Sequence, residues 1–175
     1  MLVMGVDNPD TILAGADQRG FFVRARGSIR ASLCYPLRER LLTRLEEDSG
    51  VPAVYVDLSA CTYMDSTFIG LLVAADRRVR KGSGGRLHVL DPSAPCIDLL
   101  RQIGLLEILL VEPSGPAFPP LDALEKPSGR PATEFVLEAH EELMETSEEA
   151  RRKFALLRDQ LERKLKSEKP PEGTR

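Results

Sequence analysis

The fold is decided by the stretch Val54-Tyr55-Val56-Asp57-Leu58-Ser59-Ala60-Cys61-Thr62-Tyr63-Met64-Asp65-Ser66-Thr67-Phe68-Ile69-Gly70-Leu71-Leu72. Its first five residues form a nearly continuous apolar run, which predicts a short strand covered on both faces, as in a parallel or mixed sheet with helices. A short turn follows, and Asp65-Ser66-Thr67 then predicts the first turn of a helix, with Asp65 as its cap. Hydroxyl groups at a helix N-terminus can receive an anion such as phosphate, or they can serve only to cap the helix.

Strands and helices alternate on both sides of this stretch. The expected elements, in chain order, are a strand at residues 21–26, a helix that Ser32 caps, the strand at residues 54–58, a helix at residues 67–79, a strand at residues 86–90, a helix at residues 95–102 and a strand at residues 108–111. This alternation predicts an α/β sandwich in a single domain. Arg77, Arg78, Arg80 and Lys81 gather near the end of the second helix, where they complement the helix dipole or contact an acidic patch of a partner.

The composition changes abruptly after Glu112. Prolines and glycines recur over residues 113–132, which predicts a linker, and strong helix formers return beyond it. Thr146-Ser147-Glu148-Glu149 matches a capping box with Thr146 as the cap, so we expect two C-terminal helices rather than one. The predicted division of the chain is a domain at residues 1–112 with a short N-terminal lead-in, a linker at 113–132, a helical extension at 133–169 and a disordered tail at 170–175.

The second C-terminal helix has a narrow apolar stripe. Its members recur at helical spacing: Ala150, Phe154, Leu157, Leu161 and Leu165. A stripe of this width needs a partner surface. Three surfaces would satisfy it: the domain itself, the same helix of a second copy in a homodimer, or another protein.

The composition excludes several classes of protein. A net charge of −3 and a pI near 5.5 give no electrostatic reason to expect direct binding of nucleic acid. Cys34, Cys61 and Cys96 are scattered and form no CxxC pair, which indicates reduced thiols. No signal peptide is visible, and no window approaches the run of about 18 apolar residues that a membrane span needs. We expect a cytoplasmic protein without a membrane span.

The other candidate sites favour structural roles. His88 lies in an expected strand and His140 in an expected helix, without the spacing of cysteines or carboxylates that makes a metal site, so each is expected on the surface or in the core. The loop Gly82-Ser83-Gly84-Gly85 lacks the GK[ST] ending of a phosphate-binding loop and predicts a tight turn. Nothing resembles a catalytic triad or a pair of catalytic carboxylates. We therefore expect a protein that is not an enzyme and that carries no cofactor or metal.

Three segments resemble the signature of STAS domains, in particular of the bacterial anti-sigma factor antagonists: Asp57-Leu58, Met64-Asp65-Ser66-Thr67 and Gly70-Leu71-Leu72. Gly84-Gly85-Arg86-Leu87-His88-Val89 looks like the family's turn into its next strand, and Leu99-Leu100-Arg101-Gln102-Ile103-Gly104-Leu105 looks like its late helix. The resemblance covers roughly residues 21–112. It implies an α/β, STAS-type domain whose mixed sheet has about four to five strands with helices packed on it, followed by the C-terminal helical extension.

The resemblance also implies a function that centres on Ser66. In the family, the serine at this position is phosphorylated by a partner serine kinase, which is itself the anti-sigma factor. This chain would then be an anti-sigma factor antagonist, a phosphoprotein of signal transduction and transcription regulation. It would bind the kinase and release a sigma factor until phosphorylation of Ser66 switches binding off, with a serine phosphatase as a further partner. Thr67 is the weaker acceptor, because its hydroxyl can turn toward the backbone. The implied partner surface comprises Asp57, Asp65, Ser66, Thr67 and Phe68.

Phe68 departs from the family pattern, which has Gly two residues after the serine. We expect this side chain to make the surface beside an exposed Ser66 more apolar than usual. Capping statistics alone favour a plain helix cap at Asp65 and Ser66, whereas the surrounding signature favours the switch. STAS domains also occur in signalling assemblies and lipid-transport complexes, so the alternative function is a non-catalytic scaffold or adaptor subunit.

Overall fold

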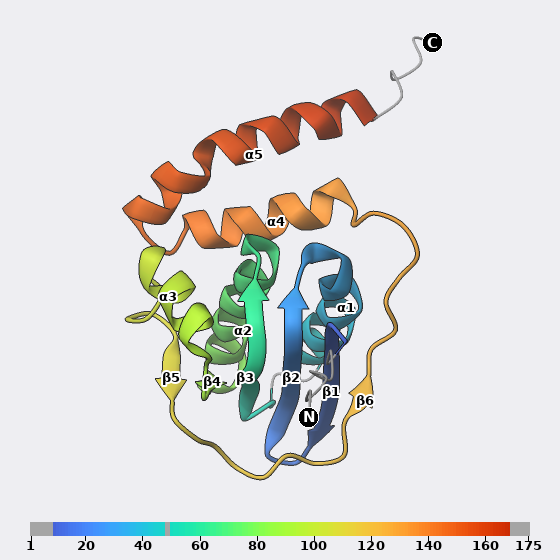
Figure 1. The fold of residues 1–175 in the computed structure, drawn as a ribbon, viewed down its shortest axis with the longest axis vertical. Helices are drawn as coiled ribbons and strands as arrows, with labels where there is room; N and C mark the ends of the chain where they lie inside the picture. Colours follow the sequence, from blue (N-terminus) through green and yellow to red (C-terminus); the bar gives the residue numbers. More distant parts are fainter. Residues whose placement is uncertain (1–8, 48–49, 169–175) are drawn as a thin grey trace, which may run out of the picture.

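A six-stranded mixed sheet forms the centre of the computed structural model, which describes residues 9–47 and 50–168 (Figure 1). The strands are β1 (Thr11–Asp17), β2 (Gly20–Ile29), β3 (Ala53–Met64), β4 (Arg86–Leu90), β5 (Leu110–Glu112) and β6 (Asp122–Ala123). The helices are α1 (Ala31–Glu47), α2 (Ser66–Ser83), α3 (Ala94–Gln102), α4 (Thr133–Met144) and α5 (Glu148–Glu168). The strand order is β5-β4-β3-β2-β1-β6; β2 to β5 are parallel, and β1 runs antiparallel to both of its neighbours.

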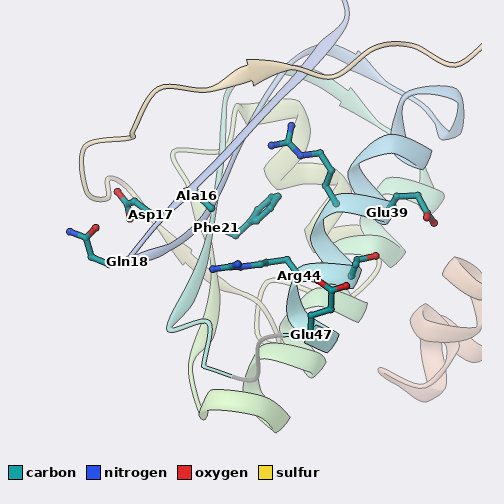
Figure 2. A pocket seen from close by; sticks show the side chains of 9 residues that line it. Ala16, Asp17, Gln18, Phe21, Glu39, Arg44 and Glu47 are labelled. Carbon is teal, nitrogen blue, oxygen red and sulfur yellow. The ribbon is translucent and has the colours of Figure 1, made fainter.

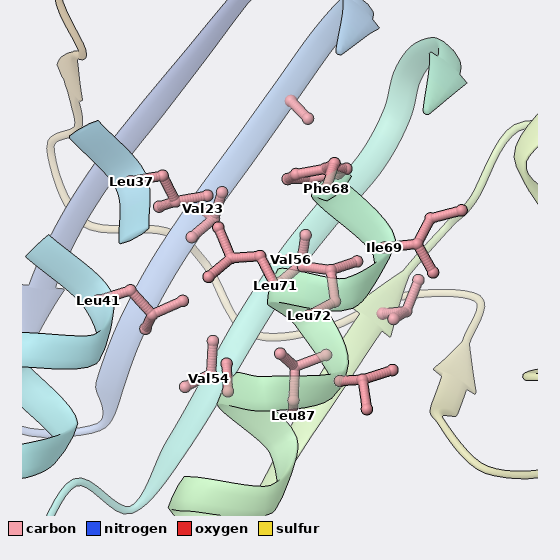
Figure 3. Close-up of a cluster of buried hydrophobic side chains, with 14 of the residues drawn as sticks. Val23, Leu37, Leu41, Val54, Val56, Phe68, Ile69, Leu71, Leu72 and Leu87 are labelled. Carbon is pink, nitrogen blue, oxygen red and sulfur yellow. The ribbon is translucent and has the colours of Figure 1, made fainter. Parts of the chain in front are cut away.

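The hydrophobic core lies between the sheet and helices α1 and α2. Val54 and Val56 of β3 are fully buried and face Leu71 and Leu72 of α2 (Figure 3). Full burial of an aliphatic side chain contributes about 1.5–3 kcal/mol, so this apolar cluster dominates the stability of the domain. The continuous apolar run of β3 therefore has the role that the sequence predicts: it is the covered strand of a parallel ladder.

Aromatic rings cover part of the opposite face of the sheet. Phe22 stacks on Tyr55 with ring centroids 5.1 Å apart, and Tyr55 stacks on His88 at 4.8 Å. Phe118, from the proline-rich segment, meets the edge of Phe22 at 5.0 Å. The segment expected as a linker thus lies against the sheet and then adds β6 to its edge beside β1.

Several local expectations differ from the structure. The sheet has six strands rather than four to five, because β1 and the two-residue β6 were not predicted. β1 was not predictable because four of the seven residues in its sequence, TILAGAD, are Ala, Gly or Asp, which have low β-propensity. β3 continues to Met64 through the expected turn, and the helix expected to be capped by Ser32 already begins at Ala31.

The C-terminal helices break near Thr146, as the sequence predicts, but a different residue caps the second one. The Ser147 hydroxyl accepts a hydrogen bond from the N–H of Ala150 at 3.0 Å, whereas the Thr146 hydroxyl donates to the Leu143 carbonyl at 2.6 Å. Ser147 is therefore the cap. Each helix in the described part of the chain is too short or too polar to span a membrane. The tail expected at residues 170–175 lies outside the described residues, and the division of the chain into domain, linker and extension stays a prediction.

A buried carboxylate attaches α2 to the neighbouring strand β4. Asp76 is only 1% exposed, and its Oδ1 accepts hydrogen bonds from the N–H of Leu87 at 3.0 Å and from Arg86 Nε at 3.2 Å. Its Oδ2 lies 2.7 Å from Arg80 Nη2. A buried charge needs such partners, so Asp76 fixes how α2 sits on the sheet.

We predict that Asp76→Ala lowers the free energy of unfolding by about 2–3 kcal/mol, because the buried Leu87 N–H loses its acceptor and two arginines lose their carboxylate. Denaturant unfolding followed by circular dichroism measures the change. Asp98→Ala is the matched control, since its pair with Arg101 is largely exposed and is worth less than about 0.5 kcal/mol. Equal losses in the two variants would contradict the role of Asp76.

Candidate functional site

The carboxylate of Asp65 caps two helices at once. Its Oδ1 accepts a hydrogen bond from the N–H of Phe68 at 3.0 Å, which caps α2. Its Oδ2 accepts one from the N–H of Ala31 at 2.7 Å, at the first residue of α1. The N–H of Asp65 donates to the Ile29 carbonyl at the end of β2 at 3.0 Å. The predicted cap is therefore confirmed, and it also joins the beginnings of both core helices.

Ser66 is the first residue of α2, and its hydroxyl contacts a histidine from the C-terminal helices. Ser66 Oγ lies 2.7 Å from His140 Nε2, and His140 Nδ1 lies 2.6 Å from the Val136 carbonyl oxygen. A carbonyl only accepts, so Nδ1 carries a hydrogen, and in the tautomer with this single ring hydrogen Nε2 accepts from the Ser66 hydroxyl. Ser66 is half-buried. The exposed hydroxyl expected from the sequence is instead engaged, because α4 covers the start of α2.

Helix α4 approaches the backbone of α2 unusually closely at Gly70. A Cβ built on Gly70 would lie 2.2 Å from the carbonyl oxygen of Ala139. Only glycine leaves room for that approach, which brings His140 within reach of Ser66. On the outer side of α4, Phe154 of α5 meets the His140 ring edge-on at 5.6 Å. His140 is 2% exposed and is thus enclosed between α2 and α5.

Ion pairs hold α4 to α1 and α2. Arg77 Nη1 lies 2.7 Å from Glu142 Oε2 and 2.5 Å from a carboxylate oxygen of Glu145. Hydrogen bonding to Glu145, with the charge of Glu142, raises the pKa of Arg77. Arg38 of α1 pairs with Glu138 at 2.5 Å. Two arginines of the cluster near the end of α2, Arg77 and Arg78, thus pair with carboxylates of this chain's own α4, and contact with a partner's acidic patch stays a prediction.

A family model described as "Mlab, STAS domain" matches residues 14–112. The chain belongs to the STAS domain family. No curated protein matches the chain by sequence. The match ends at the last residue of β5, so β6, α4 and α5 lie beyond the matched STAS domain.

Solved structures of anti-sigma factor antagonists share the STAS fold. The antagonist SpoIIAA in its unphosphorylated form is 19% identical with a TM-score of 0.51, over 58% of this chain and 87% of that one. The phosphorylated form of the Bacillus cell fate determinant SpoIIAA is 19% identical, with a TM-score of 0.48 and coverages of 58% and 90%. An antagonist from Mycobacterium paratuberculosis is 23% identical, with a TM-score of 0.49 and coverages of 61% and 89%. At 19% identity, the likeness to the unphosphorylated SpoIIAA structure shows the fold alone.

Two residues of the expected partner surface are buried in this STAS domain. Thr67 is 3% exposed, and Phe68 is fully buried within the apolar cluster of Figure 3. Phe68 therefore does not make the surface beside Ser66 more apolar, contrary to expectation. The reason is helical geometry: the third residue of α2 faces the sheet, whereas Ser66 faces α4.

The Asp57 side chain lies on the face of the sheet opposite to the face that α2, which begins at Ser66, covers. Side chains alternate along a strand, and the neighbouring Val56 faces α2. Asp57 instead accepts hydrogen bonds from Arg24 Nε at 2.8 Å and from the Ser59 hydroxyl at 2.7 Å. Burial by itself would raise the pKa of Asp57, but the Ser59 and Arg24 donors outweigh it and lower the pKa below its usual value. The structure thus does not bring Asp57 and Ser66 together, and partner binding by this set stays a prediction.

His140 is the residue that the sequence did not single out for the site. The available signal was its place on the apolar face of the helix, next to Ala139 and near Leu143, since a histidine there must find a partner. Within residues 9–47 and 50–168, no cluster of three His, Cys, Asp or Glu could hold a metal ion. A wide cavity of about 720 Å³ lies elsewhere, where Phe21 meets the outer side of α1 with charges of both signs around it (Figure 2).

We predict that Asp65→Ala lowers the free energy of unfolding by about 2 kcal/mol, because each helix cap is worth about 1 kcal/mol and this carboxylate supplies two. Asp65→Asn should cost about half as much, since an amide has one acceptor oxygen. Chemical denaturation measures both. Equal losses for Ala and Asn would contradict the bridging role of the two carboxylate oxygens.

Gly70→Ala should destabilise the protein, although in a helix interior this change normally stabilises by about 1 kcal/mol. The new Cβ would collide with the Ala139 carbonyl, so α4 must move away from α2. Denaturant unfolding gives the sign of the effect, and hydrogen exchange should show faster exchange in α4 and α5. Increased stability with unchanged exchange in α4 would show that the two helices do not approach this closely.

Proposed function

We propose that this chain is an anti-sigma factor antagonist that is switched by phosphorylation of Ser66. The observation that carries the proposal is the placement of the Ser66 hydroxyl on the first turn of α2, next to the cap Asp65, in a chain of the STAS family. The likeness in fold to an anti-sigma factor antagonist supports it. The proposed partners are a serine kinase that acts as the anti-sigma factor and a serine phosphatase, in the bacterial cytoplasm.

The start of α2 suits a phosphorylation switch on physical grounds. The first N–H groups of a helix and its dipole favour an anion, so they would stabilise a phosphate on Ser66. The phosphate adds about −1.5 to −2 charges beside the Asp65 carboxylate. At an interface this charge causes repulsion and a desolvation cost, so phosphorylation would switch partner binding off while the domain stays folded. The protein itself needs no catalytic group for this role.

Incubation with a candidate anti-sigma kinase of the same organism and ATP tests the proposal. Mass spectrometry should find one phosphate on Ser66 in the wild type and in Thr67→Val, and none in Ser66→Ala. Phosphorylated wild type should bind the kinase at least about tenfold more weakly, since repulsion of about 1.4 kcal/mol is enough for that factor. Full phosphorylation of Ser66→Ala would rule out Ser66 as the acceptor.

A second candidate is a non-catalytic STAS adaptor in a larger signalling or lipid-transport complex. The position of α4 over Ser66 favours this adaptor candidate, because a hydroxyl that contacts His140 beneath α4 is not open to a kinase active site. Wild-type protein that assembles with its partners but stays unphosphorylated on incubation with the kinase and ATP would favour the adaptor, whereas a phosphate on Ser66 that weakens binding would favour the antagonist.

A further inference from the structure

Helix α4 fills a groove between α1 and α2. Leu42 of α1 and Gly70, Leu71 and Ala74 of α2 line the groove, and Phe135 and Ala139 of α4 enter it. The space that remains among these residues is about 10 Å³, which is room for no more than about one water molecule. The groove and the helix therefore fit as closely as two parts of a protein core.

The groove carries positive charge on its rims, and α4 carries the matching negative charge. Arg38 on the α1 side pairs with Glu138. On the α2 side, Arg77 and Arg78 pair with Glu142, at 2.7 and 3.4 Å. Glu138 and Glu142 are one helical turn apart and flank Ala139, which faces Gly70. The groove therefore matches, in shape and in charge, an acidic helix that has a small residue between two carboxylates.

The attachment of α4 is of a kind that another helix can replace. α4 has 12 residues, which is too short for a stable helix in isolation, so it depends on the groove for its structure. Its ion pairs lie at the solvent-accessible rim, where each is worth only about 0–1 kcal/mol. α4 also lies outside the segment that matches the STAS family model. The helices that form the groove, α1 and α2, lie within the matched domain.

We propose that the α1–α2 groove is a binding site for an acidic amphipathic helix, which α4 occupies within the chain and which a helix of the partner protein takes over. The incoming helix has a small residue flanked by two carboxylates one turn apart, next to an aromatic side chain. When it displaces α4, His140 leaves Ser66, so the hydroxyl loses its partner within the chain and faces the incoming helix instead. The proposal rests on the proposed function only where it identifies the owner of this helix as the anti-sigma factor; the exchange of helices does not depend on phosphorylation.

Charge reversal on α4 tests the exchange and leaves the groove itself unchanged. In full-length Glu138→Lys/Glu142→Lys, the new lysines face Arg38, Arg77 and Arg78, so α4 should leave the groove and its amides should exchange with solvent faster. A fluorescein-labelled peptide of residues 131–147 with the wild-type sequence is the probe. Fluorescence anisotropy should show that it binds this variant at least about tenfold more tightly than the wild type, whose own α4 competes within the chain.

Glu134→Lys/Glu141→Lys is the matched control, because it makes the same change of charge at two exposed positions of α4. It should bind the peptide as weakly as the wild type. Ala139→Trp is a second way to expel α4, since the indole cannot fit against Gly70. Exchange in the sheet and in α1 to α3 should stay slow in all variants, which shows that the domain is folded.

Three results would overturn the proposal. The first is slow exchange of α4 in both displacing variants, since α4 would then be a fixed part of the domain. The second is the absence of peptide binding to a folded variant whose α4 has been released. The third is a wild-type dimer that the peptide dissociates, because the natural occupant would then be α4 of a second copy. None of these measurements uses a kinase, so they are independent of the phosphorylation of Ser66.

Discussion

The position of every other part of the site depends on the two hydrogen bonds that the Asp65 carboxylate accepts. One oxygen caps α2 and the other receives the first N–H of α1, while the Asp65 backbone holds the end of β2. Helix N-terminal N–H groups have no partner within the helix, and two such ends meet where two parallel strands finish. A single carboxylate satisfies both. It therefore holds the first residues of α1 and α2, the two helices that form the groove, next to each other.

The surroundings of Ser66, the residue after Asp65, differ from what the sequence alone indicates. A hydroxyl at the start of a capped helix is well placed for an anion, but here it donates to a histidine from a distant helix. Gly70 makes the contact between Ser66 and His140 possible, since any side chain at position 70 would hold α4 away from α2. Two events would thus regulate the proposed switch. The first is phosphorylation of Ser66, and the second is the binding or release of α4 at the groove.

The sequence predicted the elements whose signal is local. The apolar run of β3, the helix that follows it and the Asp65 cap are each visible within a few residues. The second cap was not predictable, because Ala31 is 34 positions from Asp65 and an N–H carries no sequence signal. The same holds for the bond between Ser66 and His140, which are 74 positions apart. Expectations failed where a side chain's direction mattered, as for Phe68, since the motif gives the order of residues but not which way each one faces.

The proline-rich segment has a mechanical consequence through β6. Because β6 is bonded into the edge of the sheet and the N–H of Leu124 still donates to the Ile12 carbonyl, the free connection to α4 comprises only residues 125–132. Eight residues span at most about 29 Å when fully extended, so a released α4 stays tethered within that radius of its anchor strand. It cannot diffuse away, and it searches a small volume around the groove from which it came. When a competing helix leaves the groove, the tethered α4 would therefore rebind without any encounter between molecules. The tether thus returns Ser66 to its covered state.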